Sequence, residues 1–367
     1  MKTICFYNTT PFWGGGEKFY FEYALGLKNK GYTIFIACSE NSPLHTKAAE
    51  NNINRFIINT SNLSFLNPFK ISTVVSFFKK NNIDTVIFST SPDLKLGGIA
   101  AKLAHVTNRV YRRGLAVPRK NSFLNRYLFG KVITKIFANS EETKQTILQH
   151  LHATIRPEKI KVIYNGIDVS KINTETTLPL EFINQHKKGV VLGNIGRLTS
   201  QKCQNQLIEV AKKLKEKNIV FSLFIGGSGE LQEPLRQQIQ KYGLVNDVYL
   251  TGFVNDVYSF MKSIDIFLLS SQWEGFGYVL VEAMLFEKPI VAYQITSNPE
   301  IVKKDETGFL VDFGNTTDFS EKVELLINNT ELRKTMGNAG KKRVQTHFDF
   351  QKKVEELILF LNRNKEL

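Results

Sequence analysis

Two glutamates, Glu274 and Glu282, stand in the run SSQWEGFGYVLVEAM (residues 270–284), which is otherwise rich in aromatic and aliphatic side chains. Burying a carboxylate without a partner is costly, so either these glutamates belong to a structural network or a polar ligand enters here. Glycines follow the first glutamate and a helix is expected after them, so free N–H groups near residues 276–279 would favour negative charge. The segment thus offers hydrogen-bond acceptors for sugar hydroxyls and donors for phosphate close together in the sequence. A nucleotide-sugar presents both groups.

Two cations follow another expected strand. Arg197 directly follows the expected strand VVLGNIG, and Lys202 comes five residues later, at the start of the next expected helix. Arginine offers a planar fork for phosphate oxygens, and lysine adds a mobile point charge. Two solvent-exposed cations are the alternative, but the position after a buried strand favours an anion-binding function.

Two glycine-rich turns also lead from an expected strand into an expected helix. Gly15 and Gly16 belong to TPFWGGGEK, where free N–H groups at a helix start could meet an anion. The spacing is not that of a dinucleotide fingerprint, and a flexible turn is an equal alternative. In LFIGGSGELQEPL, Gly227 could allow close approach to a nucleotide or serve only a tight turn.

These loops need a scaffold, and the chain alternates short β-rich runs with amphipathic helical runs, which predicts an α/β protein with parallel sheets. The expected strands are TICFYN, TIFIAC, RFIIN, TVIFST, RVYRRG, KIFANS, KVIYNG, VVLGNIGR, FSLFIGG, DVYLTGF, IDIFLLS, PIVAYQ and GFLVD. At 367 residues the chain is too long for one core, so we expect two domains. Parallel sheets bind ligands at the carboxyl ends of their strands, so the cleft between the two domains is the expected site.

We expect residues 1–168 and 189–344 to form the two domains, with a polar linker at 169–188 and an amphipathic terminal helix near 345–367. No run of about 18 apolar residues predicts a membrane-spanning helix, and no signal-peptide pattern opens the sequence. The three cysteines are far apart and make no metal-site spacing, which suits a reducing compartment. We therefore expect a cytoplasmic protein.

The net charge of +14 is concentrated in the first half of the sequence. Residues 1–170 contain 23 Lys and Arg against 10 Asp and Glu, and the segment 102–135 contains nine Lys and Arg and no acidic residue. Such a patch would attract a membrane surface, a nucleic acid or a phosphorylated acceptor. A solvated face that only aids solubility is the alternative.

The chain resembles the retaining glycosyltransferases of family GT4, which have the GT-B fold: two Rossmann-like domains with parallel sheets facing across a deep interdomain cleft. The most specific elements are the Glu274/Glu282 pair in EGFGYVLVEAM, and GRLTSQK with Arg197 and Lys202. The runs GGGEKFYFEYALGLKNKGYTIFI, ANSEET, IYNGID, GGSGE and LTGFVNDV also fall in order. The resemblance covers almost the whole chain.

This resemblance implies transfer of a sugar from a nucleotide-diphosphate sugar with its anomeric configuration retained, and without a metal or other cofactor. Arg197 and Lys202 would bind the departing diphosphate. Glu274 would hold hydroxyls of the donor sugar, Glu282 would bind the ribose, and the terminal helix would cross back to the first domain. The first domain, residues 1–168, would hold the acceptor, and the second, residues 189–344, would bind the nucleotide-sugar donor. The remaining implied donor-binding positions are Gly15, Gly16, Gly227, Phe276, Gly277, Tyr278 and Val279.

The sequence departs from the family pattern at several points. Many members carry a His-Asp pair after a mid-domain strand, where this chain has Tyr111, Arg112 and Arg113. A catalytic histidine is therefore in doubt, and the candidates for an anionic acceptor or a membrane surface are Arg112, Arg113, Arg119 and Lys120. The usual Gly-Gly before Pro-Glu is replaced by TSNPE (residues 296–300), and Glu287 stands where a small residue is usual.

The resulting interpretation is a glycosyltransferase that works on a cell-envelope glycan or lipid-linked acceptor at the inner face of a membrane, with an anionic membrane surface as a partner. A nucleotide-sugar epimerase with a similar fold is the second interpretation. Nucleic-acid binding through the basic segment is the third, and we do not expect it because the segment lacks a recognised nucleic-acid motif.

Overall fold

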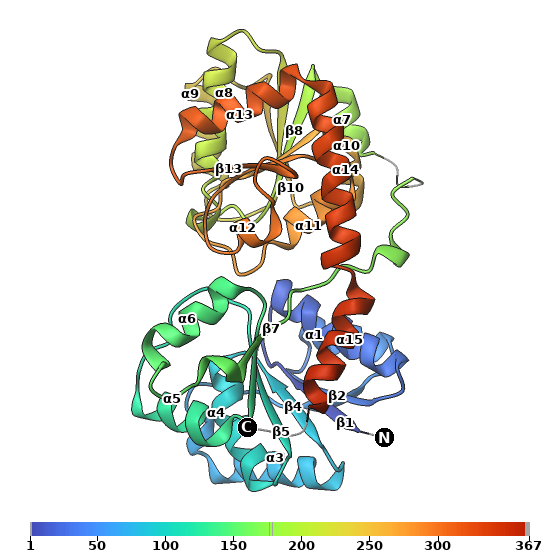
Figure 1. Ribbon diagram of the computed structural model, residues 1–367, viewed down its shortest axis with the longest axis vertical. Coiled ribbons are helices and arrows are strands. Elements are labelled where there is room, and N and C mark those ends of the chain that lie inside the picture. Colours follow the sequence, from blue (N-terminus) through green and yellow to red (C-terminus); the bar gives the residue numbers. More distant parts are fainter. Residues whose placement is uncertain (1, 176, 178, 364–367) are drawn as a thin grey trace. The chain divides into compact units, whose positions relative to one another are not determined.

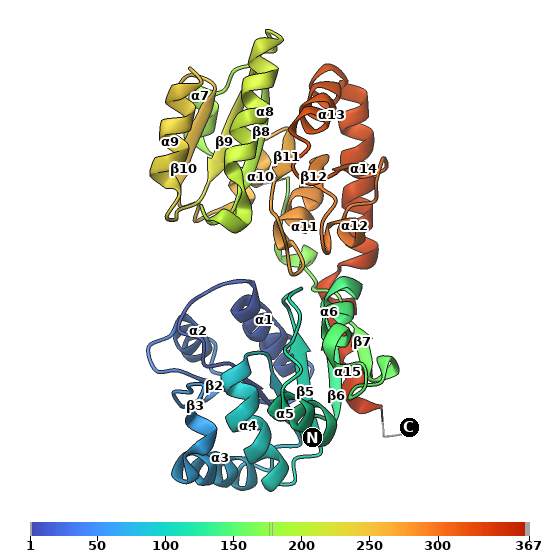
Figure 2. The ribbon, with the colours of Figure 1, turned by 90° about the vertical axis from the view of Figure 1, so that its left-hand side faces the viewer.

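The structure is a computed structural model that describes residues 2–175, 177 and 179–363. Two compact units divide the chain (Figures 1 and 2). Unit 1 comprises Met1–Asn165 and Gln351–Leu367, and unit 2 comprises Gly166–Phe350. Each unit is built on its own parallel sheet, which confirms the predicted α/β class.

Unit 1 contains a seven-stranded sheet of order β3-β2-β1-β4-β5-β6-β7. All neighbouring strands are parallel. The strands are β1 (Thr3–Tyr7), β2 (Thr33–Cys38), β3 (Asn54–Ile57), β4 (Thr85–Phe88), β5 (Asn108–Arg113), β6 (Lys135–Ala138) and β7 (Ile160–Val162). The order reverses between β1 and β4, and ligands of open parallel sheets bind at such a switch point. The glycine-rich segment that follows β1 therefore lies at a favoured place for a ligand.

The helices of unit 1 begin where the sequence supplies capping residues. The side chains of Ser42, Asn67, Thr90 and Ser140 each accept a hydrogen bond from a backbone N–H in the first turn of the helix that follows, which satisfies groups that a helix end leaves unpaired. The helices are α1 (Gly15–Asn29), α2 (Pro43–Glu50), α3 (Pro68–Lys80), α4 (Ser91–Leu103), α5 (Phe123–Tyr127), α6 (Glu141–Leu151) and α15 (Phe350–Asn362).

Unit 2 contains a six-stranded sheet of order β10-β9-β8-β11-β12-β13. The strands, all parallel, are β8 (Val190–Ile195), β9 (Phe221–Gly226), β10 (Val248–Gly252), β11 (Ile266–Leu269), β12 (Ile290–Tyr293) and β13 (Gly308–Val311). The helices are α7 (Glu181–His186), α8 (Gln204–Glu216), α9 (Gln232–Lys241), α10 (Val257–Ser263), α11 (Tyr278–Leu285), α12 (Asn298–Ile301), α13 (Thr316–Asn328) and α14 (Thr330–His347). Here the order reverses between β8 and β11, so the loops after these two strands meet at the switch point.

The packing of α8 shows how the sequence pattern builds the core of unit 2. Leu207, Ile208, Ala211 and Leu214 are fully buried, and their spacing of three and four residues places them on one face of the helix. They belong to one apolar cluster with residues of β8 and β9. This packing fixes the start of α8, and with it the loop that carries Arg197 and Lys202.

The terminal helix α15 belongs to unit 1 from residue 351 onward. The carbonyls of Phe360 and Leu361 in its last turn, and that of Arg363 directly after it, accept hydrogen bonds from Lys135 Nζ. A lysine at this end satisfies unpaired carbonyls and complements the helix dipole. Residues 364–367 of the predicted terminal helix, and Thr176 and Leu178 of the predicted linker, lie outside the described residues. No helix among the described residues is long and apolar enough to cross a membrane.

Candidate active site

Two loops at the switch point of unit 2 are joined by hydrogen bonds. Gln201 Nε2 donates to the carbonyl of Trp273 at 2.9 Å, and the backbone N–H of Gln272 donates to the carbonyl of Gln201 at 2.8 Å. Ser270 Oγ donates to the carbonyl of Lys202 at 2.8 Å. The loop after β8 and the loop after β11 therefore form one continuous edge, which brings Lys202 to Glu274.

A buried ion pair lies at the centre of this edge. Lys202 Nζ is 2.6 Å from Glu274 Oε1, and the side chains are 15% and 9% exposed. Ser271 Oγ donates to the same oxygen at 2.6 Å. Among the described residues, Glu274 Oε2 has no hydrogen-bond partner. The carboxylate thus has partners that offset its burial, and one of its two oxygens remains available to a ligand hydroxyl.

The loop after β12 holds the backbone of Glu274. Thr296 Oγ1 accepts the N–H of Glu274 at 2.9 Å. Thr296 has a φ of 38°, a left-handed conformation that a β-branched residue rarely adopts and that costs about 1–3 kcal/mol. Glycine would adopt it without strain but has no hydroxyl. Thr296 therefore combines a strained backbone with a hydrogen bond to the candidate site.

Thr296 and Ser271 were not predicted as site residues. Nothing in the sequence separates these hydroxyls from those of ordinary loop residues. The departure TSNPE pointed only to altered loop contacts near Ser297 and Asn298.

Arg197 differs from Lys202 in its surroundings. Its side chain is exposed, and Nη2 donates to Gln201 Oε1 at 3.2 Å. Gln204 Nε2 donates to the carbonyl of Arg197 at 3.0 Å, which holds its backbone at the start of α8. Among the described residues, no carboxylate pairs with Arg197. The guanidinium is therefore free to meet an anion, whereas the Lys202 ammonium is already paired.

Gly227 follows β9 and is required by the fold. Its φ is 143°, and an added Cβ would lie 1.9 Å from the carbonyl oxygen of Gly196. The loop after β8 also bonds the same turn, through the N–H of Gly196 and the carbonyl of Gly226. The tight turn is thus a sufficient reason for this glycine, and its predicted contact with a nucleotide stays a prediction.

Helix α11 carries the remaining predicted donor-binding residues of unit 2. Gly277 precedes the helix with a φ of 82°, and Tyr278 and Val279 form the first helical positions. Phe276 is buried, with its ring 5.5 Å from that of Tyr278 and 5.8 Å from that of Phe348. Because this ring packs in the core, a ligand would meet Phe276 through its backbone. Glu282 is buried in the second turn of the helix.

The glycine loop of unit 1 leads directly into α1. Gly15 is the first helical residue, and Gly16 has nothing within 4 Å of an added Cβ. Asn8 Nδ2 donates to Glu17 Oε1 at 3.0 Å and so ties the helix to the end of β1. No packing contact requires a glycine at position 16, in contrast to Gly227. The predicted cleft between the domains, and the diphosphate contact of Gly15 and Gly16, stay predictions.

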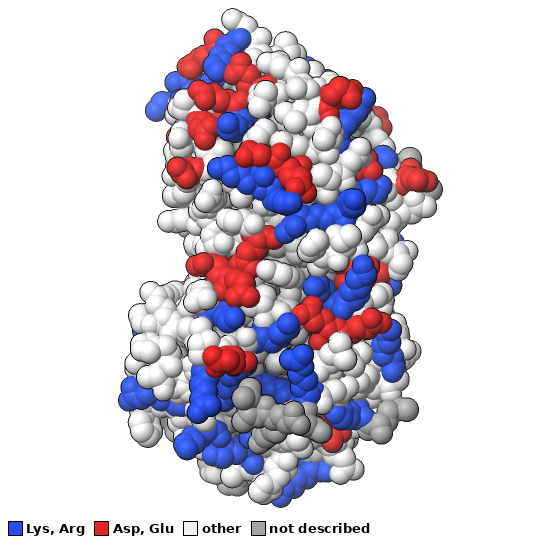
Figure 3. Space-filling model, in the orientation of Figure 1, with Lys and Arg blue, Asp and Glu red and all other residues white. Residues whose placement is uncertain are grey.

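The structure corrects the expectation of one exposed basic patch over residues 102–135. Side chains of a strand alternate between the two faces of a sheet, and the carboxyl end of β5 is buried. Arg112 and Arg113 are only 3% and 7% exposed. Arg109 donates to the carbonyls of Val106 and Val132, and Lys135 caps α15. On the face drawn in Figure 3, basic side chains are nevertheless frequent over unit 1.

Arg113 and Arg119 surround a buried tyrosine. Both guanidinium groups donate to the hydroxyl of Tyr111, and Arg113 also donates to the carbonyl of Val117. Burial alone would raise the pKa of Tyr111, but the charges of Arg119 and Arg113 outweigh burial and lower that pKa. Lys120 is exposed. Of the four predicted acceptor or membrane residues, only Lys120 is thus fully at the surface.

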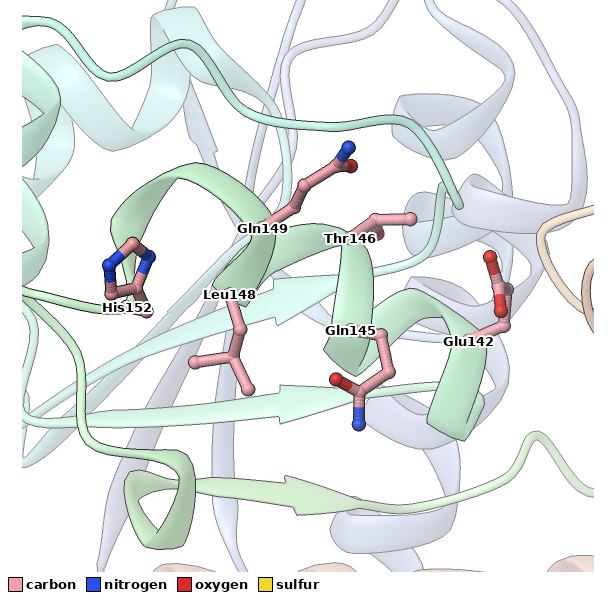
Figure 4. Close-up of a pocket in the computed structure, with 6 residues that line it drawn as sticks. All are labelled: Glu142, Gln145, Thr146, Leu148, Gln149 and His152. Atoms are coloured by element: carbon pink, nitrogen blue, oxygen red, sulfur yellow. The ribbon is translucent and has the colours of Figure 1, made fainter.

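A hollow on unit 1 is not part of this site. It is lined by Glu142, Gln145, Thr146, Leu148, Gln149 and His152. Figure 4 shows that these side chains point in different directions around α6 and do not converge on a ligand position. Among the described residues, no group of three or more His, Cys, Asp or Glu could hold a metal ion.

Both halves of the chain match known families. Residues 180–343 match the family described as "Glycosyl transferases group 1", and residues 13–171 match "Glycosyltransferase Family 4". The chain is 29% identical over 345 residues to the capsular polysaccharide biosynthesis glycosyltransferase CapM of Staphylococcus aureus, covering 90% of each protein. It is 26% identical over 348 residues to the UDP-Gal:alpha-D-GlcNAc-diphosphoundecaprenol alpha-1,3-galactosyltransferase of Escherichia coli, covering 90% of this chain and 89% of that protein.

Solved structures show the same fold. A glycosyltransferase from Rickettsia africae ESF-5 superposes with a TM-score of 0.87 at 21% identity, covering 98% of this chain and 97% of that chain. Anabaena Alr3699/HepE, solved in complex with UDP and glucose, superposes with a TM-score of 0.82 at 22% identity, covering 98% and 99%. The predicted GT-B fold is therefore confirmed.

Proposed function

The chain belongs to the group 1 and family 4 glycosyltransferases, and from that premise we propose that it moves a sugar from a nucleotide-diphosphate sugar to a hydroxyl of a cell-envelope glycan or a lipid-linked acceptor. Transfer in this family retains the anomeric configuration and needs no metal. The relatives support the finer part of the proposal, because one is named for capsular polysaccharide biosynthesis and another for an undecaprenol-diphosphate acceptor.

The observation that carries this proposal is the Lys202–Glu274 pair beside the exposed Arg197. A nucleoside diphosphate gathers negative charge as it departs, and cations that are already in place lower the barrier. Arg197 would meet the diphosphate from solvent, and Lys202 would approach it from a fixed position. Glu274 Oε2 would accept a hydrogen bond from a hydroxyl of the donor sugar, while Oε1 keeps its hydrogen bonds to Lys202 and Ser271.

We assign no side chain as the nucleophile. With retention, the acceptor hydroxyl would attack from the face on which the diphosphate leaves, and a phosphate oxygen would take its proton. The side chains would then bind and orient both substrates, and fixed positive charge would stabilise the leaving group. Glu282 would bind the ribose from the adjacent helix.

We further propose that the enzyme works from the cytoplasm on an anionic membrane surface. Lys120, Arg126 and Lys131 are exposed around α5, and the side chain of Phe123 is 80% exposed beside them. Exposed cations are attracted to anionic lipid, and an aromatic side chain can enter the interface. Flotation with neutral and anionic vesicles tests this part, and equal binding to both would refute it.

A thermal-shift panel of UDP-, GDP- and ADP-sugars, with the free nucleotides as controls, would identify the donor. Transfer assays with that donor should then show a large loss of activity in Arg197→Ala, Lys202→Ala and Glu274→Ala. Lys212→Ala is the matched control, because Lys212 lies on α8 in an exposed pair with Glu216. Wild-type turnover in Arg197→Ala would exclude the diphosphate assignment, and interconversion of the donor sugar without acceptor would favour an epimerase.

A further inference from the structure

The guanidinium of Arg112 is a buried charge without an anion. The side chain ends β5 and is 3% exposed. Nη2 donates to Asn165 Oδ1 at 3.3 Å, and Cζ lies 3.9 Å from the centre of the Phe19 ring. Nε is buried without a hydrogen-bond partner. Among the described residues, no carboxylate forms an ion pair with Arg112.

Arg112 is costly in this state. A guanidinium has five N–H donors, and within the described part of the chain Arg112 makes one hydrogen bond, to the neutral Asn165 Oδ1. Stacking on Phe19 contributes a cation–π attraction, but burial of an unpaired cation is unfavourable unless an anion completes the site. The arrangement therefore indicates a binding partner that carries negative charge.

The surroundings of Arg112 place such a partner at the ligand-binding edge of the sheet. Arg112 stands at the carboxyl end of β5, and Asn165 follows β7 on the same edge, where parallel sheets bind ligands. Asn165 is 2% exposed, and among the described residues its Nδ2 has no hydrogen-bond partner. Nδ2 and the unused N–H groups of Arg112 could donate to the same ligand.

The neighbouring Arg113 does not share this property. Residues 112 and 113 lie on opposite faces of the sheet. Arg113 is bonded to Tyr111 and to the carbonyl of Val117, whereas Arg112 contacts α1 through Phe19. The predicted group of four cations therefore separates into different environments, and one member lacks a partner suited to its charge.

We propose that Arg112 and Asn165 bind an oxyanion, a phosphate or a carboxylate, of the substrate held by unit 1, and that Arg112 thereby selects an anionic acceptor. This inference rests on the proposed function and on the prediction, implied by the family resemblance, that the first domain holds the acceptor. The planar fork of arginine suits two oxygens of one such group. We assign the oxyanion to a phosphate next to the acceptor sugar, and the transfer assays below distinguish it from a carboxylate on the donor sugar.

Binding of small probes tests the site without requiring transfer. Isothermal titration would compare geranyl diphosphate with geraniol, using wild type, Arg112→Gln, Arg112→Lys and Lys80→Gln. We expect Arg112→Gln to weaken geranyl diphosphate at least tenfold, and Arg112→Lys to give an intermediate loss because lysine lacks the fork. Lys80→Gln, which removes an exposed charge from the last turn of α3 in the same unit, should change affinity less than twofold. Equal affinity of wild type and Arg112→Gln would overturn an acceptor-phosphate site.

Transfer assays separate the two sources and the two proposals. With a sugar on a short polyprenyl diphosphate as acceptor, Arg112→Gln should raise KM at least tenfold and leave donor affinity unchanged. With a neutral alkyl glycoside as acceptor, it should have no effect. A loss that instead follows a uronic-acid donor, and not a neutral hexose donor, would assign the oxyanion to the donor and overturn the acceptor claim. Equal losses with neutral and anionic substrates would show a purely structural role.

Failure of the proposed function would give a different pattern. Wild type would bind geranyl diphosphate through Arg112 but transfer no sugar from any donor. Melting curves would show whether Arg112→Gln is folded. If it is not, Arg112→Lys keeps the charge, and its ratio of KM values for anionic and neutral acceptors supplies the test.

Discussion

Removal of the Lys202 ammonium should destabilise unit 2 far more than removal of an exposed lysine. Lys202→Met would leave Glu274, 9% exposed, with the Ser271 hydroxyl as its remaining side-chain partner. Breaking a buried ion pair from one side costs about 3–5 kcal/mol, and we expect about 3 kcal/mol because that hydroxyl remains. The control is Lys212→Met in an exposed helical pair, which should cost about 0.5 kcal/mol or less.

The chain supplies its own reporter for this measurement. It has two tryptophans, one in each unit, and Trp273 adjoins Glu274. In a Trp13→Phe background, urea unfolding followed by the remaining tryptophan reports unit 2 alone, which avoids mixing two transitions. A free energy of unfolding for Lys202→Met within about 0.5 kcal/mol of the Lys212→Met value would refute the buried pair.

A double variant separates stability from catalysis. In Lys202→Met the Glu274 carboxylate is left unpaired, and adding Glu274→Gln replaces it by a neutral amide. The double variant should therefore lose about 2 kcal/mol less free energy of unfolding than the sum of the two single losses. Transfer should remain lost, because neither the cation nor the carboxylate is restored. Recovery of activity along with stability would mean that the pair only supports the loop.

Four further substitutions test other features of the two units. Thr296→Gly relieves the strain of the positive φ but removes the acceptor of the Glu274 N–H. The free energy of unfolding in urea should therefore change by less than about 1 kcal/mol, while kcat/KM falls about tenfold. An unchanged kcat/KM would contradict this. Gly227→Ala should lower the urea concentration at which unit 2 unfolds, because the added Cβ would lie 1.9 Å from a carbonyl oxygen. Gly16→Ala has open space for its Cβ, so the free energy of unfolding should stay the same or rise by about 0.5 kcal/mol, while donor binding weakens. Burial raises the pKa of Asp93 and outweighs the hydrogen bonds that lower it. The folded state therefore holds the proton more tightly than the unfolded state. The free energy of unfolding falls as the pH rises from the pKa of Asp93 in the unfolded chain to its pKa in the folded chain. Asp93→Asn should remove this fall in urea titrations between pH 4 and 8 followed by Trp13, and an unaltered pH profile would exclude it.

The sequence predicted the strands well, because buried parallel strands are continuous apolar runs that stand out from their loops. It also placed Arg197, Lys202 and Glu274 after strands that meet at a switch point. It did not predict that Lys202 pairs with Glu274, because the pairing depends on hydrogen bonds between two loops that are distant in sequence. The hydrogen bond between the Thr296 hydroxyl and the Glu274 N–H could not be predicted for the same reason.

Charge counting failed in a different way, because burial and not composition decides what a cation can meet. Within residues 102–135, Arg109, Arg112, Arg113 and Lys135 are directed into unit 1 or toward its backbone carbonyls. The proposed attraction to a membrane then depends on a smaller group of cations that are fully exposed. These are Lys120, Arg126 and Lys131, which flank Phe123.

Two variants would separate the electrostatic and apolar parts of membrane binding. Neutralising Lys120, Arg126 and Lys131 to Gln should weaken binding to anionic vesicles about a hundredfold, at about 1 kcal/mol for each charge, and should remove most of its salt dependence. Phe123→Ser should weaken binding by about 2 kcal/mol while the salt dependence remains, since it removes only apolar contact. If the triple variant binds as wild type does while Arg112→Gln does not, the buried arginine governs membrane attachment, and the exposed group around α5 has no part in it.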